Sequence, residues 1–176
     1  VYKRQKSGSP YGNAAGASKG LVMRLLYRRR HVRIDCMPHT EVTCPAGTII
    51  GVQDEHVRRF HSVPYSRIDA PFDDPLPAEQ GLLIDATAPR PGSPAISITT
   101  PQGATALADL PVLVWIHGGR FETGDHTETL SNPDGFARAG VIHVRVGYRL
   151  RFPGLMPFHT DPPAHYRAVA DCQQAL

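Results

Sequence analysis

The chain has 176 residues, 41% of them hydrophobic and 20% charged, a composition that predicts a soluble globular protein of one or two domains. The formal charge of +3 is unevenly distributed, because nine of the 19 Lys and Arg residues and only one of the 16 acids lie in residues 1–35. The acidic remainder argues against nucleic acid as the main partner, and no apolar run approaches the ~20 residues of a membrane span.

Residues 1–36 are dominated by Gly, Ser, Lys and Arg and show no sustained periodic pattern. We expect them to be either a disordered basic tail or translated sequence upstream of the true start, with Met37 as the initiator. Arginines at 28–33 suggest one alternative function, the binding of nucleic acid or an anionic membrane, which the acidic body would oppose. The folded domain is expected over residues 37–176.

Short β-prone runs open this domain. Residues 48–52 and 56–60 are two such runs separated by a polar pair, Asp54 and Glu55, and this arrangement predicts a hairpin. Residues 62–94 contain seven prolines. We expect them to be mostly irregular, since proline disrupts both helix interiors and central strands.

The second half of the chain alternates between predicted strands and helices. Residues 95–100 alternate in polarity with period two, as a strand with one buried face does. Residues 111–116 form a continuous apolar run, typical of a strand that is covered on both faces, and residues 141–146 are a second candidate for such a strand. Residues 133–138 and 162–176 are predicted helices, the latter starting at its proline pair. This order predicts an α/β sheet.

The cysteines are Cys36, Cys44 and Cys172. An odd number with irregular spacing and no C-x-x-C pair predicts neither a disulfide framework nor a zinc site. A reduced, cytoplasmic location fits this set.

The turn after the 111–116 strand reads His117-Gly118-Gly119. Two successive glycines let the backbone approach a ligand closely, and their N–H groups can point into a pocket. Such donors stabilise the negative charge that develops on a carbonyl oxygen during acyl transfer, each by ~3 kcal/mol. The turn therefore indicates an oxyanion hole, and the alternative is an ordinary Gly-Gly turn after a core strand.

Five segments in sequence order resemble motifs of the type B carboxylesterase/lipase family, which includes the cholinesterases. The resemblance covers residues 47–176. The segments are Phe60–Ser66 for F-x-G-I-P-Y-A, Asp85–Thr87 for D-A-T, Leu110–Gly119 for the oxyanion strand, Gly147–Leu155 for N-Y-R-L-x-x-x-G-F and Asp171–Leu176 for D-Q-x-x-A-L.

This resemblance implies the N-terminal portion of an α/β-hydrolase fold, with a small antiparallel β region leading into a mostly parallel sheet. It also implies hydrolysis of small-molecule carboxylic esters through a serine acyl-enzyme, without metal or organic cofactor. The implied oxyanion hole is lined by Gly118, Gly119 and Arg120, the last two standing at the second and third glycines of H-G-G-G. The catalytic triad is expected after Leu176, so the chain alone is expected to be inactive.

Two departures from the family pattern stand out. Arg120 replaces the third glycine; its cation either attracts an acidic substrate group, or points to solvent or pairs with Glu122 or Asp125. Ser93 and Ser97 occupy the Cys and Asn positions of E-D-C-L-x-L-N, so the early disulfide of the family is not expected. A non-catalytic, cholinesterase-like binding protein is the alternative function, and the residue at the downstream serine position would discriminate between the two.

The remaining candidate residues have structural interpretations. The G-x-S-x-G pattern at 16–20 lacks a preceding strand and is interpreted as a chance match. His117 is expected to brace its turn, whereas neither His126 nor His143 has an evident serine or carboxylate partner. His159, Asp161 and His165 have the wrong spacing for a metal site. Asp171 is expected to pair with Arg149 or Arg167, and Trp115 to lie in the core.

Overall fold

The computed structural model describes residues 37–92 and 94–176. Residues 1–36, which include the arginines at 28–33, Cys36 and the pattern at 16–20, lie outside the described residues, as does Ser93. The interpretations given for them remain predictions.

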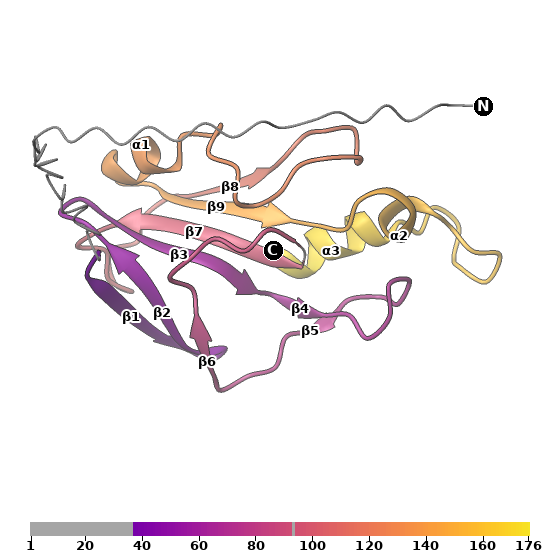
Figure 1. Cartoon of the computed structure of the whole chain (residues 1–176), viewed down its shortest axis with the longest axis horizontal. Helices are drawn as coiled ribbons and strands as arrows, with labels where there is room; N and C mark the ends of the chain where they lie inside the picture. The colour runs from indigo at the N-terminus through magenta and orange to yellow at the C-terminus, as the bar shows by residue number, and fades with distance from the viewer. Residues whose placement is uncertain (1–36, 93) are drawn as a thin grey trace, which may run out of the picture. The chain divides into compact units, whose positions relative to one another are not determined.

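Seven strands of the described region form one mixed sheet, ordered β1-β2-β3-β7-β9-β8, with β6 beside the start of β2 (Figure 1). The strands are β1 (His39–Cys44), β2 (Gly47–Gln53), β3 (Val57–Pro64), β6 (Leu82–Asp85), β7 (Ala95–Pro101), β8 (Val112–Ile116) and β9 (Ile142–Gly147). Two short strands, β4 (Ser66–Arg67) and β5 (Leu76–Pro77), pair separately. The predicted hairpin is confirmed as β2–β3, whereas β1 and β6 were not predicted.

Strand directions change across the sheet. Neighbours from β1 through β2, β3 and β7 to β9 are antiparallel, and β9 and β8 are parallel. This is the expected start of an α/β-hydrolase fold, in which an antiparallel region leads into parallel pairing. The described region reaches only the first pair of that parallel part.

Three helices are described: α1 (Pro133–Arg138), α2 (Arg151–Leu155) and α3 (Arg167–Ala175). The predicted helix at 133–138 is confirmed, since the Asn132 side chain accepts a hydrogen bond from the Gly135 N–H and Pro133 occupies the first turn. The predicted start at Pro162 is wrong, because α3 begins at Arg167. No helix in the described ranges combines the length and apolar character needed to cross a membrane.

The two faces of the sheet differ in chemistry because side chains alternate along each strand. On one face Phe60, Ile98 and Val144 share a register row. Phe60 is part of the buried apolar core with Ile49, Val63 and Ala86.

The other face is polar and yet buried. It carries Ser97, Thr99, His143 and Arg145, each at most 3% exposed. α1 packs against β7 and β9 on this face, and the Phe136 ring lies 5.5 Å from that of His143.

β8 is a strand as predicted, but the expectation that both its faces are covered is wrong. In the described region it lies at the edge of the sheet, paired on one side with β9. Val112, Ile116 and Trp115 are 57%, 48% and 40% exposed, so Trp115 is not a core residue here. β9 lies between β7 and β8 and has the buried character predicted for it.

Candidate functional site

The carboxyl ends of β8 and β9 meet at one edge of the sheet because the two strands are parallel neighbours. The turn at 117–124 follows β8, and residues 148–150 lead from β9 into α2. Open α/β sheets bind ligands outside the carboxyl ends of their strands. We therefore treat this edge as the candidate active site.

His117 braces the turn, as the sequence indicated. Its ring is 4% exposed and stacks on Tyr148, with ring centroids 4.4 Å apart. His117 Nδ1 lies 2.8 Å from the Gly118 carbonyl oxygen. Since that oxygen can only accept, Nδ1 carries the hydrogen. A Cβ at Gly124 would lie 2.0 Å from His117 Nδ1, so the ring fits only because position 124 is glycine.

Gly119 is the residue on which the turn depends. Its φ of +110° is rarely adopted by residues with a Cβ, and a Cβ there would lie 2.0 Å from the Thr123 carbonyl oxygen. The Gly119 carbonyl accepts hydrogen bonds from the N–H groups of Glu122 and Thr123, at 2.9 and 3.2 Å. The turn is thus a closed, tightly packed unit.

Three backbone donors of this turn have no partner within the described residues. Within the described residues, the backbone N–H groups of Gly118, Gly119 and Arg120 donate to no other protein atom, and all three residues are exposed. Arg120 adopts a φ of +57°, so the turn tolerates a side chain at the third position. Its side chain is exposed and, in the described region, forms no ion pair with Glu122 or Asp125.

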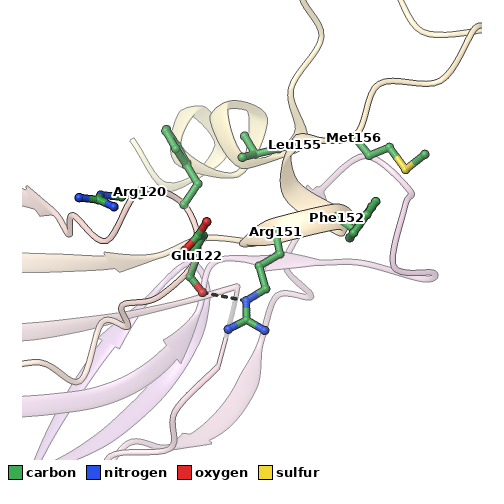
Figure 2. A pocket seen from close by; sticks show the side chains of 7 residues that line it. Arg120, Glu122, Arg151, Phe152, Leu155 and Met156 are labelled. Atoms are coloured by element: carbon green, nitrogen blue, oxygen red, sulfur yellow. Dashed lines mark hydrogen bonds between the residues drawn. The ribbon is translucent and has the colours of Figure 1, made fainter.

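A cavity of about 550 Å³ opens beside the turn (Figure 2). The cavity lies between the turn that follows β8 and helix α2, which follows β9. The Arg151 N–H donates to the Phe121 carbonyl at 2.7 Å, and Arg151 Nε donates to the Glu122 carbonyl at 2.9 Å. The residues that line the cavity are Arg120, Phe121, Glu122, Arg151, Phe152, Leu155 and Met156.

His126 does have a serine partner, which corrects the sequence-based interpretation. Ser97 Oγ lies 2.8 Å from His126 Nδ1, and both side chains are fully buried. The partner was missed because it lies 29 residues away, on the polar face of β7. Asp125 lies on the other side of the ring, with Oδ1 3.8 Å from Nε2, which is too far for a hydrogen bond.

This Ser–His–Asp arrangement does not have the geometry of a nucleophile. Ser97 has no exposed surface on which a substrate carbonyl could reach its hydroxyl. Burial lowers the pKa of His126, so the ring is held neutral. Asp125 instead accepts the N–H groups of Gly92 and Thr127, at 2.6 and 2.8 Å. We interpret these hydrogen bonds as structural, because they hold the loop at residues 125–127 against β7.

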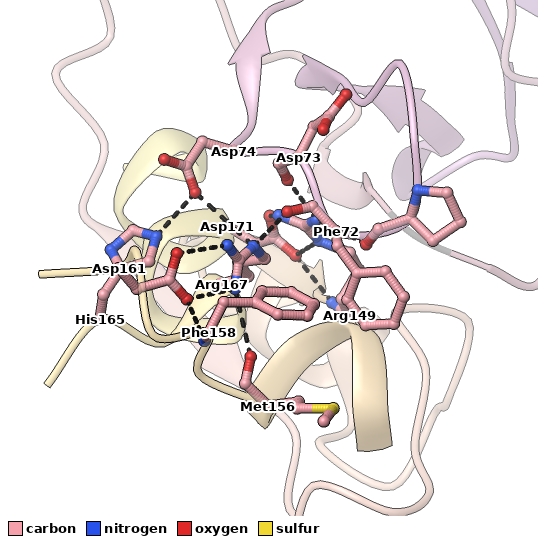
Figure 3. Close-up of polar contacts among 11 residues, drawn as sticks. Phe72, Asp73, Asp74, Arg149, Met156, Phe158, Asp161, His165, Arg167 and Asp171 are labelled. Carbon is pink, nitrogen blue, oxygen red and sulfur yellow. Dashed lines mark hydrogen bonds and ion pairs between the residues drawn. The ribbon is translucent and has the colours of Figure 1, made fainter.

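Arg149 and Asp171 form the buried ion pair expected for Asp171 (Figure 3). The Asp171 carboxylate accepts hydrogen bonds from the Arg149 backbone N–H, Nε and Nη2, at 2.9, 2.9 and 2.7 Å. Arg149 Nη1 donates to the Pro71 and Asp73 carbonyls. The pair therefore ties α3 and the 71–73 loop to the segment that follows β9.

A second arginine extends this cluster. Arg167 binds both carboxylate oxygens of Asp161 and the Phe72 carbonyl, and its guanidinium lies 5.1 Å from the centre of the Phe158 ring. His165 Nε2 lies 2.7 Å from an Asp74 oxygen. His165 and Asp161 thus have separate partners (Figure 3).

The comparison with protein families decides the identity of the chain. Residues 94–176, which contain the turn and both parallel strands, match the Carboxylesterase family model. Residues 94–176 of this chain belong to the carboxylesterase family.

Proteins that are similar to this chain include a hydrolase and an esterase. It is 30% identical to a probable N-octanoylanthranilate hydrolase of Rhodococcus erythropolis, over 65% of this chain and 31% of that protein. It is also 30% identical to a para-nitrobenzyl esterase of Bacillus subtilis, over 65% of this chain and 28% of that protein. A solved PNB esterase structure aligns with a TM-score of 0.67 at 28% identity, covering 78% of this chain and 33% of that one. The chain therefore spans about a third of these relatives.

Sequence reasoning located the turn but missed two residues of the site. Tyr148 belongs to the segment that resembled N-Y-R-L, and its stacking on His117 could not be read from spacing because 31 residues separate them. Arg151 follows the same segment directly. Neither side chain belongs to a pattern that predicts a pocket, and the parallel pairing of β8 with β9 brings both to the turn.

Proposed function

We propose that the protein carrying this chain hydrolyses small-molecule carboxylic esters through a serine acyl-enzyme, and that this chain supplies its oxyanion hole. One observation carries the proposal. Gly118, Gly119 and Arg120 are exposed residues, and their three adjacent backbone N–H groups have no protein acceptor within the described residues. They lie at the edge where α/β sheets bind ligands.

In this proposal the N–H groups receive the oxygen that becomes negative when the ester carbonyl turns tetrahedral. Preorganised donors stabilise that state more than the substrate, because they need not reorient as charge develops. Preorganisation has a physical basis here. The His117 ring stacks on Tyr148 and occupies the space that a Cβ at position 124 would fill. The Gly119 carbonyl accepts hydrogen bonds from N–H groups of its own turn.

The nucleophile, acid and base are proposed to lie outside this chain, in the part of the protein that corresponds to the uncovered part of the relatives. In this proposal the nucleophilic serine follows the segment that Asp171–Leu176 resembles. Ser97, the serine with a histidine partner among the described residues, is buried and is not proposed to react.

The proposal is tested with a fluorophosphonate, which labels activated serines, and with an activated aryl ester. We expect the longer protein that carries this chain to be labelled and to hydrolyse 4-nitrophenyl butyrate. We expect the 176-residue chain alone to do neither. Serine-dependent turnover by the chain alone would show that its nucleophile has been misplaced. Binding of esters without hydrolysis by the longer protein would favour a non-catalytic binding protein instead.

A further inference from the structure

Two arginines line the cavity beside the oxyanion turn, one from each of the segments that follow β8 and β9. Arg120 directly follows Gly119, and Arg151 begins α2. Glu122 is the acidic residue of the lining, so the formal charge of the lining is +1. The described residues contain no ion pair between Glu122 and either arginine.

The backbone around this cavity is held in an unfavourable conformation. Seven non-glycine residues of the described region have a positive φ, and three of them, Arg120, Phe121 and Arg151, line the cavity. Their φ values are +57°, +61° and +55°. Left-handed backbone is unfavourable for residues with a Cβ, and such strain gathers at ligand-binding sites.

Arg151 is the better placed of the two cations. Its Nε donates to the Glu122 carbonyl at 2.9 Å, which fixes the plane of the guanidinium. Within the described residues Nη1 and Nη2 have no acceptor and no carboxylate pairs with them. Figure 2 shows the Arg151 side chain beside Glu122 below α2, whereas Arg120 extends away from the other labelled residues. A guanidinium oriented in this way offers two parallel donors to a carboxylate.

The rest of the lining is apolar and accessible. Phe152, Phe121 and Met156 are 70%, 44% and 42% exposed, and Leu155 is half-buried beside them. An apolar lining that also includes a cation suits a ligand with a hydrocarbon portion and an anionic group.

We propose that Arg151 is a specificity-determining residue that binds a carboxylate of the substrate, while the apolar lining takes its hydrocarbon part. The preferred substrates are then esters that carry a free carboxylate at a few carbons from the scissile bond. This inference rests on the proposed ester hydrolysis for its catalytic meaning, but the carboxylate site itself does not depend on turnover.

Binding to the 176-residue chain tests the site without catalysis. The probes are 4-phenylbutyrate and its uncharged amide, measured by isothermal titration calorimetry. We expect the carboxylate to bind about tenfold more tightly than the amide, the order of magnitude of a charge-assisted hydrogen bond. Arg151→Gln should abolish this preference. Arg138→Gln is the matched control, because Arg138 is exposed, precedes β9 and so lies at the opposite end of the strand.

Equal affinity for acid and amide, or an unchanged preference in Arg151→Gln, would overturn the proposal. Loss of the preference in Arg138→Gln as well would also overturn it, because general surface charge would then explain the binding.

Kinetics on the longer protein separate this inference from the proposed function. The substrates are the mono-4-nitrophenyl ester of glutaric acid, which is anionic, and 4-nitrophenyl butyrate, which is neutral. Arg151→Gln should lower the anionic-to-neutral ratio of kcat/KM by about tenfold, and Arg151→Lys should restore part of it. An unchanged ratio contradicts the carboxylate site, whereas no hydrolysis of either ester by the unaltered protein contradicts only the proposed function.

Discussion

The rings of His117 and Tyr148 stack with their planes 11° apart, and the Tyr148 hydroxyl donates to the His117 carbonyl at 2.8 Å. The two residues follow β8 and β9, so this contact joins the parallel strands at their carboxyl ends. Both are at most 4% exposed. The turn at 117–124 is therefore supported from the neighbouring strand as well as by hydrogen bonds within its own loop.

Tyr148→Phe is expected to keep the stacking and remove this hydrogen bond. The buried His117 carbonyl then loses its donor, which should lower the free energy of unfolding by about 1–3 kcal/mol. Urea unfolding measures the change. Tyr166→Phe is the control, since Tyr166 is 43% exposed and its hydroxyl has no hydrogen-bond partner in the described region. Equal losses for both variants would show that the bond to His117 does not matter.

Stability should fall as the pH drops below about 6.5, because burial lowers the pKa of His61, His126 and His143 in the folded protein. Their folded pKa lies below the ordinary value of 6.5, so the unfolded chain takes up protons first and unfolding is favoured. Each histidine contributes at most about 1.4 kcal/mol per pH unit.

Urea unfolding between pH 7.5 and about 5 tests this prediction. Asp125 and Asp161, whose pKa is lowered from 3.8, lose their contribution at lower pH and do not interfere. A free energy of unfolding that stays constant or rises as the pH falls through this window would contradict neutral, buried histidines.

Asp171→Asn should be strongly destabilising. Asp171 is fully buried and the Arg149 side chain is 7% exposed, so the variant leaves a buried guanidinium without its counter-charge. A loss of about 3–5 kcal/mol is expected. Asp69→Asn is the matched control, because its partner Arg67 is half-exposed and exposed pairs contribute about 1 kcal/mol or less. If thermal unfolding changes equally in the two variants, burial of the Arg149 pair is not the cause.

The free edge of β8 should promote self-association. An edge strand offers unpaired backbone groups, and Val112, Trp115 and Ile116 add exposed apolar surface. Val112→Lys is expected to shift the sedimentation profile of the 176-residue chain toward the monomer. Leu107→Lys adds the same charge at a residue that is 94% exposed and outside any strand. An equal shift with Leu107→Lys would attribute association to net charge and not to the edge.

Secondary-structure elements that depend on residues close together in the sequence were predictable. The alternation at 95–100 became β7, the apolar run at 141–146 became β9, and Pro133 with Asn132 began α1. The His117-Gly118-Gly119 turn was recognisable because Gly119 meets a requirement for positive φ that the chain satisfies locally.

Features that depend on distant residues were not predictable. β6 lies in the proline-rich region and forms because β2 offers it a parallel partner. The polar face of β7 reads as exposed, but the His126 loop and α1 cover it. β8 was expected to be covered because its composition is apolar, and in the described region no second neighbour pairs with it.

The most direct test of the oxyanion hole is kcat for hydrolysis of 4-nitrophenyl butyrate by the longer protein with Gly119→Ala, compared with Gly103→Ala. A Cβ at Gly119 meets the Thr123 carbonyl at 2.0 Å and must displace the turn, whereas a Cβ at Gly103 meets nothing within 4 Å. The account predicts that kcat falls about 100-fold or more in Gly119→Ala, the loss seen when an oxyanion donor is removed. A folded Gly119→Ala enzyme with the kcat of Gly103→Ala would contradict it.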